Sequence, residues 1–301
     1  MNHRNSIILR ANQDSSQAIS FKRFENEGKV MIYNIDKNRN CNLTCECQVS
    51  ENNVDIIDCV FFPCAYGNII AFGMADHSII FKKENFNGES LQYETIEMEN
   101  DDTDSSNSSQ LPQFGSNLRI SLHPPELNLG FISTDGIIHI FFIDYGNKIK
   151  LIPIRRYRNN EIFLWFNFND NSSIWCATQN KIHKYALNSF DSKIEKILPT
   201  KLQLKNDESE LKFIDASISP VKFENDERVA VLMSDGNVHI FLGNPGSQHP
   251  VSKIESEIEN PLSVEWSPLG TRIAICSEVS SPKCYIESTY NVWNEIETST
   301  K

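Results

Sequence analysis

One eight-residue phrase occurs twice in this chain. TDGIIHIF covers residues 134–141 and SDGNVHIF covers residues 234–241. Each copy has a polar pair, then a glycine, then alternating apolar residues with a histidine at the same position. A two-residue Asp-Gly turn between alternating β-forming residues is typical of a β-hairpin. We therefore expect an internal repeat that is built from β-hairpins.

Weaker copies of the hairpin occur along the rest of the chain. Their turns are expected at about Gly28, Asp76, Asp135, Asn180, Asp235 and Ser281. The lead-in to several hairpins also repeats, as a strand, a proline-bearing turn and a second strand, in residues 61–73, 121–133, 217–234 and 265–277. Steps of roughly 50 residues are in the range of propeller blades.

The sequence therefore predicts an all-β fold, a WD-repeat-like β-propeller with six four-stranded blades in a single domain over residues 1–301. Inner strands are expected to be apolar and outer strands more polar. The blades are predicted at about residues 5–50, 54–98, 115–155, 160–200, 211–245 and 261–298.

Two connecting segments lack the pattern of a strand. The acidic run ENDDTDSSNSSQ, residues 99–110, has no apolar residue to bury and is predicted to be a mobile loop. The segment PVSKIESEIENP, residues 250–261, is flanked by prolines and is expected to be a loop with one helical turn.

Charge and hydropathy restrict the partners. The formal net charge is −12, from 28 basic and 40 acidic residues, and an acidic surface disfavours direct binding to nucleic acid or anionic lipid. The densest basic stretch, IRRYR at 154–158, is interpreted as a solvated loop. The start of the chain is too short and polar for a signal peptide, and no run of about 18 apolar residues could span a bilayer. We expect a soluble intracellular protein without direct membrane insertion.

Neither the cysteines nor the histidines form a metal-binding or catalytic motif. Eight cysteines are present without a CxxC pair, so we expect no metal and no cofactor. His139 and His239 share one position of the repeated phrase, which favours a structural role on a strand. The residues Asp135, Gly136, Asp235 and Gly236 are interpreted as turn formers. No hydrolase, metalloprotease or nucleotide-binding motif occurs, so we predict that the chain is not an enzyme and has no catalytic residues.

The two ends of the chain each supply enough strands for a complete blade. A closed propeller commonly places its first and last strands in one sheet, because unpaired strand edges invite association. Here the first and last blades each have four strands of their own, so we expect an open propeller that is completed by a β-blade from a partner. The predicted partner-binding residues are Ile7, Leu9, Ile19, Phe21, Val264, Trp266, Ile273 and Ile275.

Three stretches of the sequence resemble one family. AYGNIIAFGMADHSIIFKKE (65–84), GSNLRISLHPPELNLGFISTDGIIHIF (115–141) and SVEWSPLGTRIAICSE (263–278) are similar to blades of the SEH-type nucleoporin. They are also similar to its paralogue in the outer coat of COPII vesicles. Both are WD-repeat propellers that stay open at six blades. This sequence differs from the general WD pattern because it has no Gly-His or Trp-Asp dipeptide.

The resemblance implies a scaffold role in the nuclear pore complex, in protein and mRNA transport. The implied partner is an α-solenoid nucleoporin that donates a β-blade, together with other subunits of the Y-shaped complex at the nuclear envelope. It also implies sharing with a nutrient-signalling complex at the lysosome or vacuole membrane. One alternative is a COPII outer-coat propeller at the cytoplasmic face of the endoplasmic reticulum. An alternative of another class is a phosphoinositide-binding propeller of the autophagy type, with Arg155 and Arg156 as its adjacent arginines.

Overall fold

The structure is a computed structural model, and it divides into two compact units, residues 1–160 and residues 161–301. The described residues are 7–12, 16–22, 26–37, 40–76, 78–86, 91–99, 119–123, 127–133, 135–146, 148–169, 173–187, 193–198, 210–222, 227–243, 249–267 and 269–296. Most of the predicted acidic loop, residues 100–110, lies outside them. The prediction that this loop is mobile therefore stays a prediction.

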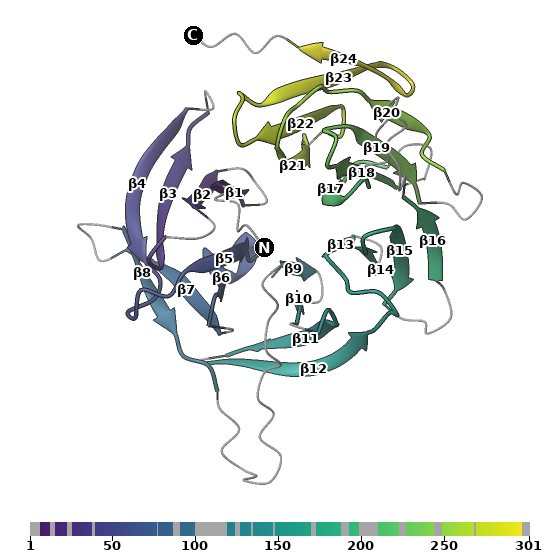
Figure 1. Ribbon diagram of the computed structural model, residues 1–301. Helices are drawn as coiled ribbons and strands as arrows, with labels where there is room; N and C mark the ends of the chain where they lie inside the picture. The colour runs from purple at the N-terminus through teal and green to yellow at the C-terminus, as the bar shows by residue number, and fades with distance from the viewer. Residues whose placement is uncertain are drawn as a thin grey trace. The chain divides into compact units, whose positions relative to one another are not determined.

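The first unit contains three four-stranded sheets (Figure 1). The strands of the first sheet are β1 (Ile7–Ala11), β2 (Gln17–Lys22), β3 (Lys29–Ile35) and β4 (Cys41–Gln48). Those of the second are β5 (Ile56–Phe61), β6 (Ile69–Met74), β7 (Ile79–Phe86) and β8 (Leu91–Ile96), with a short 3-10 helix η1 (Cys64–Tyr66) between β5 and β6. Those of the third are β9 (Ile120–His123), β10 (Asn128–Ile132), β11 (Ile138–Tyr145) and β12 (Ile149–Tyr157).

The second unit also contains three four-stranded sheets. The strands of the fourth sheet are β13 (Trp165–Asn169), β14 (Ser173–Ala177), β15 (Lys181–Ala186) and β16 (Lys193–Ile197). Those of the fifth are β17 (Phe213–Ile218), β18 (Arg228–Met233), β19 (Val238–Leu242) and β20 (Ser252–Ile254). Those of the sixth are β21 (Pro261–Trp266), β22 (Arg272–Ser277), β23 (Lys283–Thr289) and β24 (Val292–Ile296).

All six sheets have the meander topology of β-propeller blades. In each sheet the four strands are consecutive in sequence and antiparallel to their neighbours. This confirms the predicted all-β fold class and its six four-stranded blades. The first strand of the chain, β1, pairs with β2, and the last strand, β24, pairs with β23. Both terminal sheets are therefore complete from their own segments.

Burial follows the position of a strand within its sheet. The second strands β6 and β18 are buried at every position, whereas the outer strands β4 and β8 are mostly exposed or half-buried. A central strand has neighbours on both edges and both faces, so its sequence is continuously apolar. An outer strand has one free edge and reads as polar. Within the described residues, no helix is long and apolar enough to span a bilayer.

Buried carboxylates tie the inner strands of neighbouring sheets together. In the first unit, Asp58 on β5 forms an ion pair with Arg10 on β1 at 3.0 Å and accepts the backbone N–H of Ile120 on β9. In the second unit, Asp215 on β17 accepts the backbone N–H of Val264 on β21. A buried carboxylate is stable only when it is paired or hydrogen-bonded, so these aspartates fix the spacing of adjacent sheets.

The repeated hairpins have a longer loop than the sequence suggested. The amide of Ser133 bonds the carbonyl of Ile137, and that of Met233 bonds the carbonyl of Asn237, so each loop has three residues and not two. Gly136 and Gly236 have φ angles of +72° and +83°. This is the geometry of a type I turn that is followed by a left-handed residue, which closes the hairpin with a bulge.

The outer strand of the fifth blade lies beyond its expected boundary. We expected this blade to end near residue 245 and residues 250–261 to be a loop. Instead β20 (Ser252–Ile254) pairs with β19 inside that segment. The alternation of a three-residue strand is too short to be distinguished from a loop between prolines, and its pairing partner lies earlier in the chain.

Candidate interaction surface

The first sheet has two faces of different character. One face packs against the second sheet and includes Ile19, Val30 and Ile32, in a core cluster with Ile70 and Phe72. Side chains alternate between the faces of a strand, so the residues between these positions lie on the opposite face. We call that opposite face the far face of the first sheet. It is formed by Ala18, Ser20, Lys22, Lys29, Met31, Tyr33, Leu43 and Glu46.

The far face exposes apolar side chains on a hydrogen-bonded sheet. Met31 is 47% exposed and Leu43 is 59% exposed. The hydroxyl of Ser20 donates to the hydroxyl of Tyr33 at 3.3 Å, and Tyr33 in turn contacts the sulfur of Met31 at 3.3 Å. Leu43 lies opposite Tyr33 across the ladder. These contacts hold Met31, Tyr33 and Leu43 together as one apolar surface.

A pocket of about 460 Å³ is lined by Met31 and Ser20 of the far face and by Phe21 and Val30 of the opposite face. Lys22, Lys29 and Glu46 line its rim, and all three side chains are exposed. Lys29 and Glu46 form an ion pair with a nitrogen to oxygen distance of 4.0 Å, which contributes little to stability at an exposed position. The far face thus combines an apolar centre with a charged rim, which is the usual composition of a protein–protein interface.

The sixth sheet also has a face that does not pack on its neighbour. Its apolar face contacts the fifth sheet, whereas Ala274, Cys276, Cys284 and Ile286 lie on the opposite face and are half-buried. Burial is the main cause that raises the pKa of the Cys276 thiol. The thiol therefore stays protonated at neutral pH and acts as a small apolar group.

The predicted partner-binding residues lie mostly on the buried faces. Ile19 and Phe21 belong to the core between the first two sheets, and Ile19 is fully buried. The backbone of Leu9 lies opposite Ser20, and that of Ile7 lies opposite Lys22, but their side chains are outside the described part of the structure. The four residues of the last blade are buried against the fifth sheet: Val264, Trp266, Ile273 and Ile275.

The described side chains among these residues therefore stabilise the core of the unit to which each belongs. Trp266 donates its indole N–H to the carbonyl of Ser217 at 3.1 Å and lies under the guanidinium of Arg228 at 4.8 Å. A role of these residues in partner binding stays a prediction. Sequence reasoning missed Met31 and Leu43, because an apolar residue in an otherwise polar outer face gives no periodic signal. It also missed Asp58 and Asp215, although a lone aspartate in an apolar strand is a visible signal.

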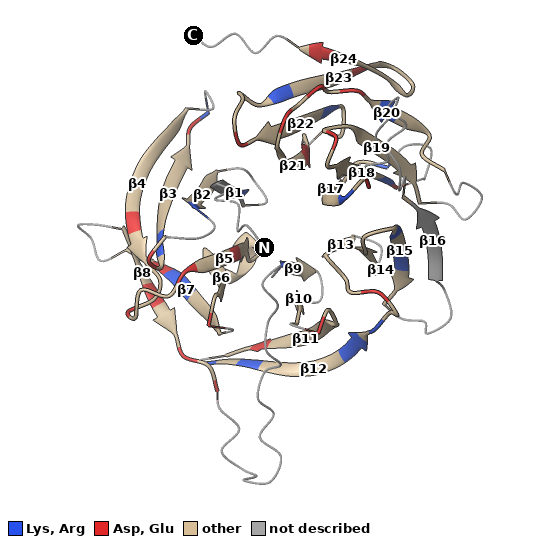
Figure 2. Ribbon diagram, viewed as in Figure 1, with Lys and Arg blue, Asp and Glu red and all other residues tan. Residues whose placement is uncertain are grey.

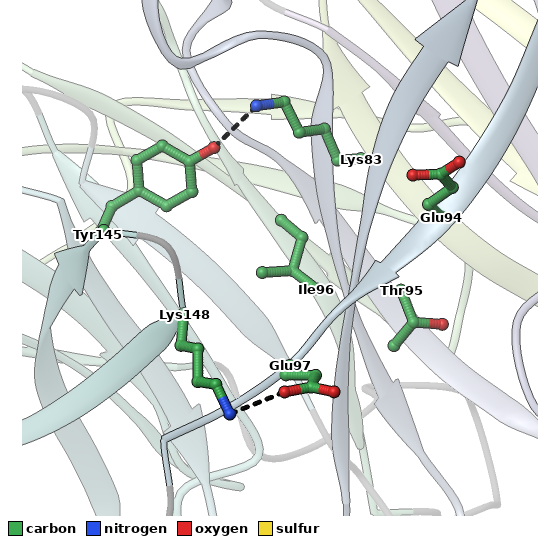
Figure 3. Close-up of a pocket in the computed structure, with 8 residues that line it drawn as sticks. Lys83, Glu94, Thr95, Ile96, Glu97, Tyr145 and Lys148 are labelled. Carbon is green, nitrogen blue, oxygen red and sulfur yellow. Dashed lines mark hydrogen bonds and ion pairs between the residues drawn. The ribbon is translucent and has the colours of Figure 1, made fainter. Parts of the chain in front are cut away.

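A second pocket, of about 440 Å³, lies in the first unit between β8 and the β11–β12 turn (Figure 3). The ammonium of Lys83 donates to the hydroxyl of Tyr145 at 3.0 Å, and Lys148 pairs with Glu97 at 2.7 Å. This pair lowers the pKa of Glu97 and raises that of Lys148. Just beyond β8, Met98 forms a parallel bridge with Ile149, so these contacts join the second and third sheets.

One serine, one aspartate and one histidine meet at the turn of the third blade. The hydroxyl of Ser133 bonds the carboxylate of Asp135, and Nε2 of His139 lies 3.2 Å from the same hydroxyl. In a Ser-His-Asp triad the histidine lies between the other two, because it must take the serine proton and be oriented by the aspartate. Here the serine lies in the middle and is buried. The arrangement therefore stabilises the turn.

The remaining candidate groups are dispersed. Among the described residues, no three histidine, cysteine or acidic side chains are grouped so that they could hold a metal ion. All eight cysteines are free thiols, and burial raises the pKa of Cys47 to about 11. IRRYR, which was expected to be a loop, lies mostly in strand β12, whose blue end is visible in Figure 2. Arg155 is half-buried and lies over the ring of Tyr157, whereas Arg156 is exposed.

No family model matches the sequence, and the search of curated proteins finds no match.

Proposed function

We propose that the chain is a non-enzymatic scaffold propeller that binds a partner through the far face of its first sheet. The observation that carries this proposal is the pair of exposed side chains Met31 and Leu43 on a sheet that already has four strands of its own. A complete sheet with an exposed apolar face is stabilised when a second sheet covers it. Strands that a partner donates would supply such a layer.

Burial of these two side chains alone is not enough to hold a partner in a stable complex. Full burial of one exposed methionine or leucine contributes about 1.5–3 kcal/mol, and both are already partly covered. A stable obligate interface usually buries more than about 2,000 Å². We therefore propose that the partner covers the whole far face, from its apolar centre to the exposed Lys22, Lys29 and Glu46.

The resemblance to SEH-type nucleoporins supplies the finer proposal. On this hypothesis the partner is an α-solenoid nucleoporin that donates a β-blade, and the chain works in the Y-shaped complex at the nuclear envelope. Six blades that are each built from consecutive strands are consistent with this proposal. The COPII coat remains the alternative within the same family. Identification of the protein that co-purifies, a nucleoporin or the rod subunit of the vesicle coat, distinguishes the two.

The test compares two surfaces of the same unit. Met31→Glu combined with Leu43→Glu places carboxylates on the far face, at side chains that are exposed. Phe86→Glu is the matched control, because Phe86 is 68% exposed at the end of β7. The chain and its variants are co-expressed with the α-solenoid nucleoporin of the same organism and purified through a tag on the chain.

We expect the double variant to lose the partner and Phe86→Glu to keep it. The melting temperature of each variant alone should stay close to that of the parent chain, because solvated substitutions change stability little. Retention of the partner by the double variant would refute the far-face proposal. If a vesicle-coat subunit co-purifies instead and the same double variant loses it, the far face is still the binding surface, but the complex is the COPII coat.

A further inference from the structure

Serine comes directly before proline at three places in this chain. No threonine precedes any of the 12 prolines, and the three serine–proline pairs are Ser219–Pro220, Ser267–Pro268 and Ser281–Pro282. One class of protein kinase accepts a serine only where proline follows it. Proline has no backbone N–H and favours an extended backbone at the residue before it, so it marks the acceptor by its geometry. The sequence therefore contains three candidate acceptors, and the structure distinguishes between them.

Two of the three serines have hydroxyl groups that stabilise turns. Ser219, just after β17, is 6% exposed, and its hydroxyl donates to the carbonyl of Val221 at 2.8 Å. Ser267, just after β21, is half-buried, and its hydroxyl accepts the amide of Arg272 at 3.1 Å. A kinase holds its substrate serine in an extended segment, so either residue would first have to leave its turn. In the folded chain both serines are therefore poor acceptors.

The third serine lies in a loop that is exposed at every position. Residues 278–282 connect β22 to β23, and all five are exposed. We call them the 278–282 loop. Ser281 is followed by Pro282, and the next strand begins only at Lys283. A kinase therefore reaches the Ser281 hydroxyl without opening the sheet.

Hydrogen bonds at both ends hold the 278–282 loop in place. At its start, the Ser277 hydroxyl accepts the amide of Ser280 at 3.3 Å. At its end, the ammonium of Lys283 donates to the carbonyl of Ser256 at 2.9 Å. Ser281 lies between these two contacts. A group that is attached to its hydroxyl therefore leaves both contacts intact.

We propose that Ser281 is a phosphorylation site for a kinase that requires proline after the acceptor, and that the phosphate changes the surface of the sixth sheet without unfolding it. In the reaction, the Ser281 oxygen forms a bond to the γ-phosphorus of ATP while the bond from this phosphorus to the β,γ-bridging oxygen breaks. ADP leaves, and the hydroxyl proton passes to a base of the kinase. The phosphate adds a charge of about −1.5 to −2 near neutral pH.

The charges of the loop itself do not neutralise this phosphate. Its single charged residue is Glu278, which repels a second negative group. Lys283, which follows the loop, already donates to the carbonyl of Ser256 and lies 3.4 Å from the carboxylate of Glu295. The phosphate is therefore available to an arginine-containing site of another protein, which is the usual way in which phosphoserine is recognised.

The proposal is tested on the full chain with two purified kinases. The chain is incubated with ATP and either a cyclin-dependent or a mitogen-activated protein kinase, because both require the proline, and phosphate is mapped by mass spectrometry. Ser281→Ala removes the acceptor, and Pro282→Ala removes the residue that marks it. Ser280→Ala is the matched control, because Ser280 is exposed in the same loop but is followed by serine. Synthetic peptides around Ser219 and Ser267 test these sequences outside the fold.

We expect phosphate at Ser281 alone, both in the parent chain and in Ser280→Ala. Ser281→Ala and Pro282→Ala should abolish its incorporation. The peptides around Ser219 and Ser267 should be phosphorylated, whereas the same serines in the folded chain should not. The melting temperature of the phosphorylated chain should stay close to that of the unmodified chain, because solvated surface changes affect stability little.

Several results would contradict the proposal. An unmodified Ser281 in the parent chain would exclude the site, and phosphate on Pro282→Ala would exclude this class of kinase. Phosphate on Ser219 or Ser267 in the folded chain, or peptides that stay unmodified, would show that burial does not select the acceptor. A clear fall in melting temperature after phosphorylation would show that the loop supports the sheet. None of these results depends on the far face of the first sheet.

Discussion

The third and fifth blades carry the same phrase at their hairpin turns, but the two turns are stabilised differently. At the third blade, Ser133 precedes the phrase and bonds both Asp135 and His139. At the fifth blade, the matching position is Met233, which is fully buried and whose side chain has no hydroxyl to bond Asp235 or His239. Nδ1 of His239 is buried without a hydrogen-bond partner among the described residues. The residue just before the repeated phrase, Ser133 or Met233, therefore decides whether the histidine has a hydroxyl group as a hydrogen-bond partner.

The fifth turn gains its stability from another part of its sheet. The backbone of Gly236 lies close to that of Ile258, and its carbonyl accepts a hydrogen bond from the buried Ser256 hydroxyl. In addition, Asp235 accepts the amide and side-chain N–H groups of Asn237. The repeated sequence therefore fixes the backbone of the turn, whereas the side-chain contacts of the turn depend on the segment that packs on it.

The largest expected difference between the turns follows from their glycines. Both have positive φ, so alanine at either position costs about 1–2 kcal/mol in backbone strain. A β-carbon on Gly236 would also overlap the carbonyl oxygen of Ile258. We expect Gly236→Ala to lower the free energy of unfolding clearly more than Gly136→Ala does, as measured by urea denaturation. Equal losses of unfolding free energy in the two variants would mean that the backbone at Ile258 moves aside without destabilising the protein.

A smaller difference is expected from the two serines. Ser133→Ala removes the partner of Asp135 and of the buried His139, and leaving a buried polar group unsatisfied costs about 1–3 kcal/mol. Ser234→Ala removes only the acceptor of the Lys212 amide, which is exposed to water. It should cost less than about 1 kcal/mol in the same denaturation experiment. A larger loss of stability in Ser234→Ala than in Ser133→Ala would show that the hydrogen bond to the Lys212 amide contributes more than those to Asp135 and His139.

The smallest expected effect concerns pH. Burial is the main cause that lowers the pKa of both His139 and His239 below the ordinary value of 6.5. As the pH falls below about 6.5, the unfolded chain takes up protons before the folded chain does, so stability decreases. His139→Gln and His239→Gln should each reduce this pH dependence between pH 7 and 5, as followed by the melting temperature. An unchanged slope in both variants would show that other groups cause it.

Much of the fold could be predicted from local patterns. Alternation and glycine-bearing turns located the blades, because strand periodicity and turn conformation depend on residues that are close in sequence. The strand β20 was missed because three residues carry too little periodicity, and the loop length was misjudged because the closing hydrogen bond involves Ser133 or Met233 just outside the phrase. The predicted partner-binding role of the terminal blades stays a prediction. Alternation selected Ile19, Val264 and similar residues, which the structure places in cores.

The sequence by itself determined an all-β chain of six four-stranded blades, with both terminal blades complete from their own strands. Only the tertiary structure decided which face of each sheet is covered. A strand's pattern shows that one of its faces is apolar, but the neighbour that buries it is chosen by contacts between residues far apart in the chain, such as Asp58 with Ile120. For the same reason, Met31 and Leu43 emerge as exposed only when the packing around them is known.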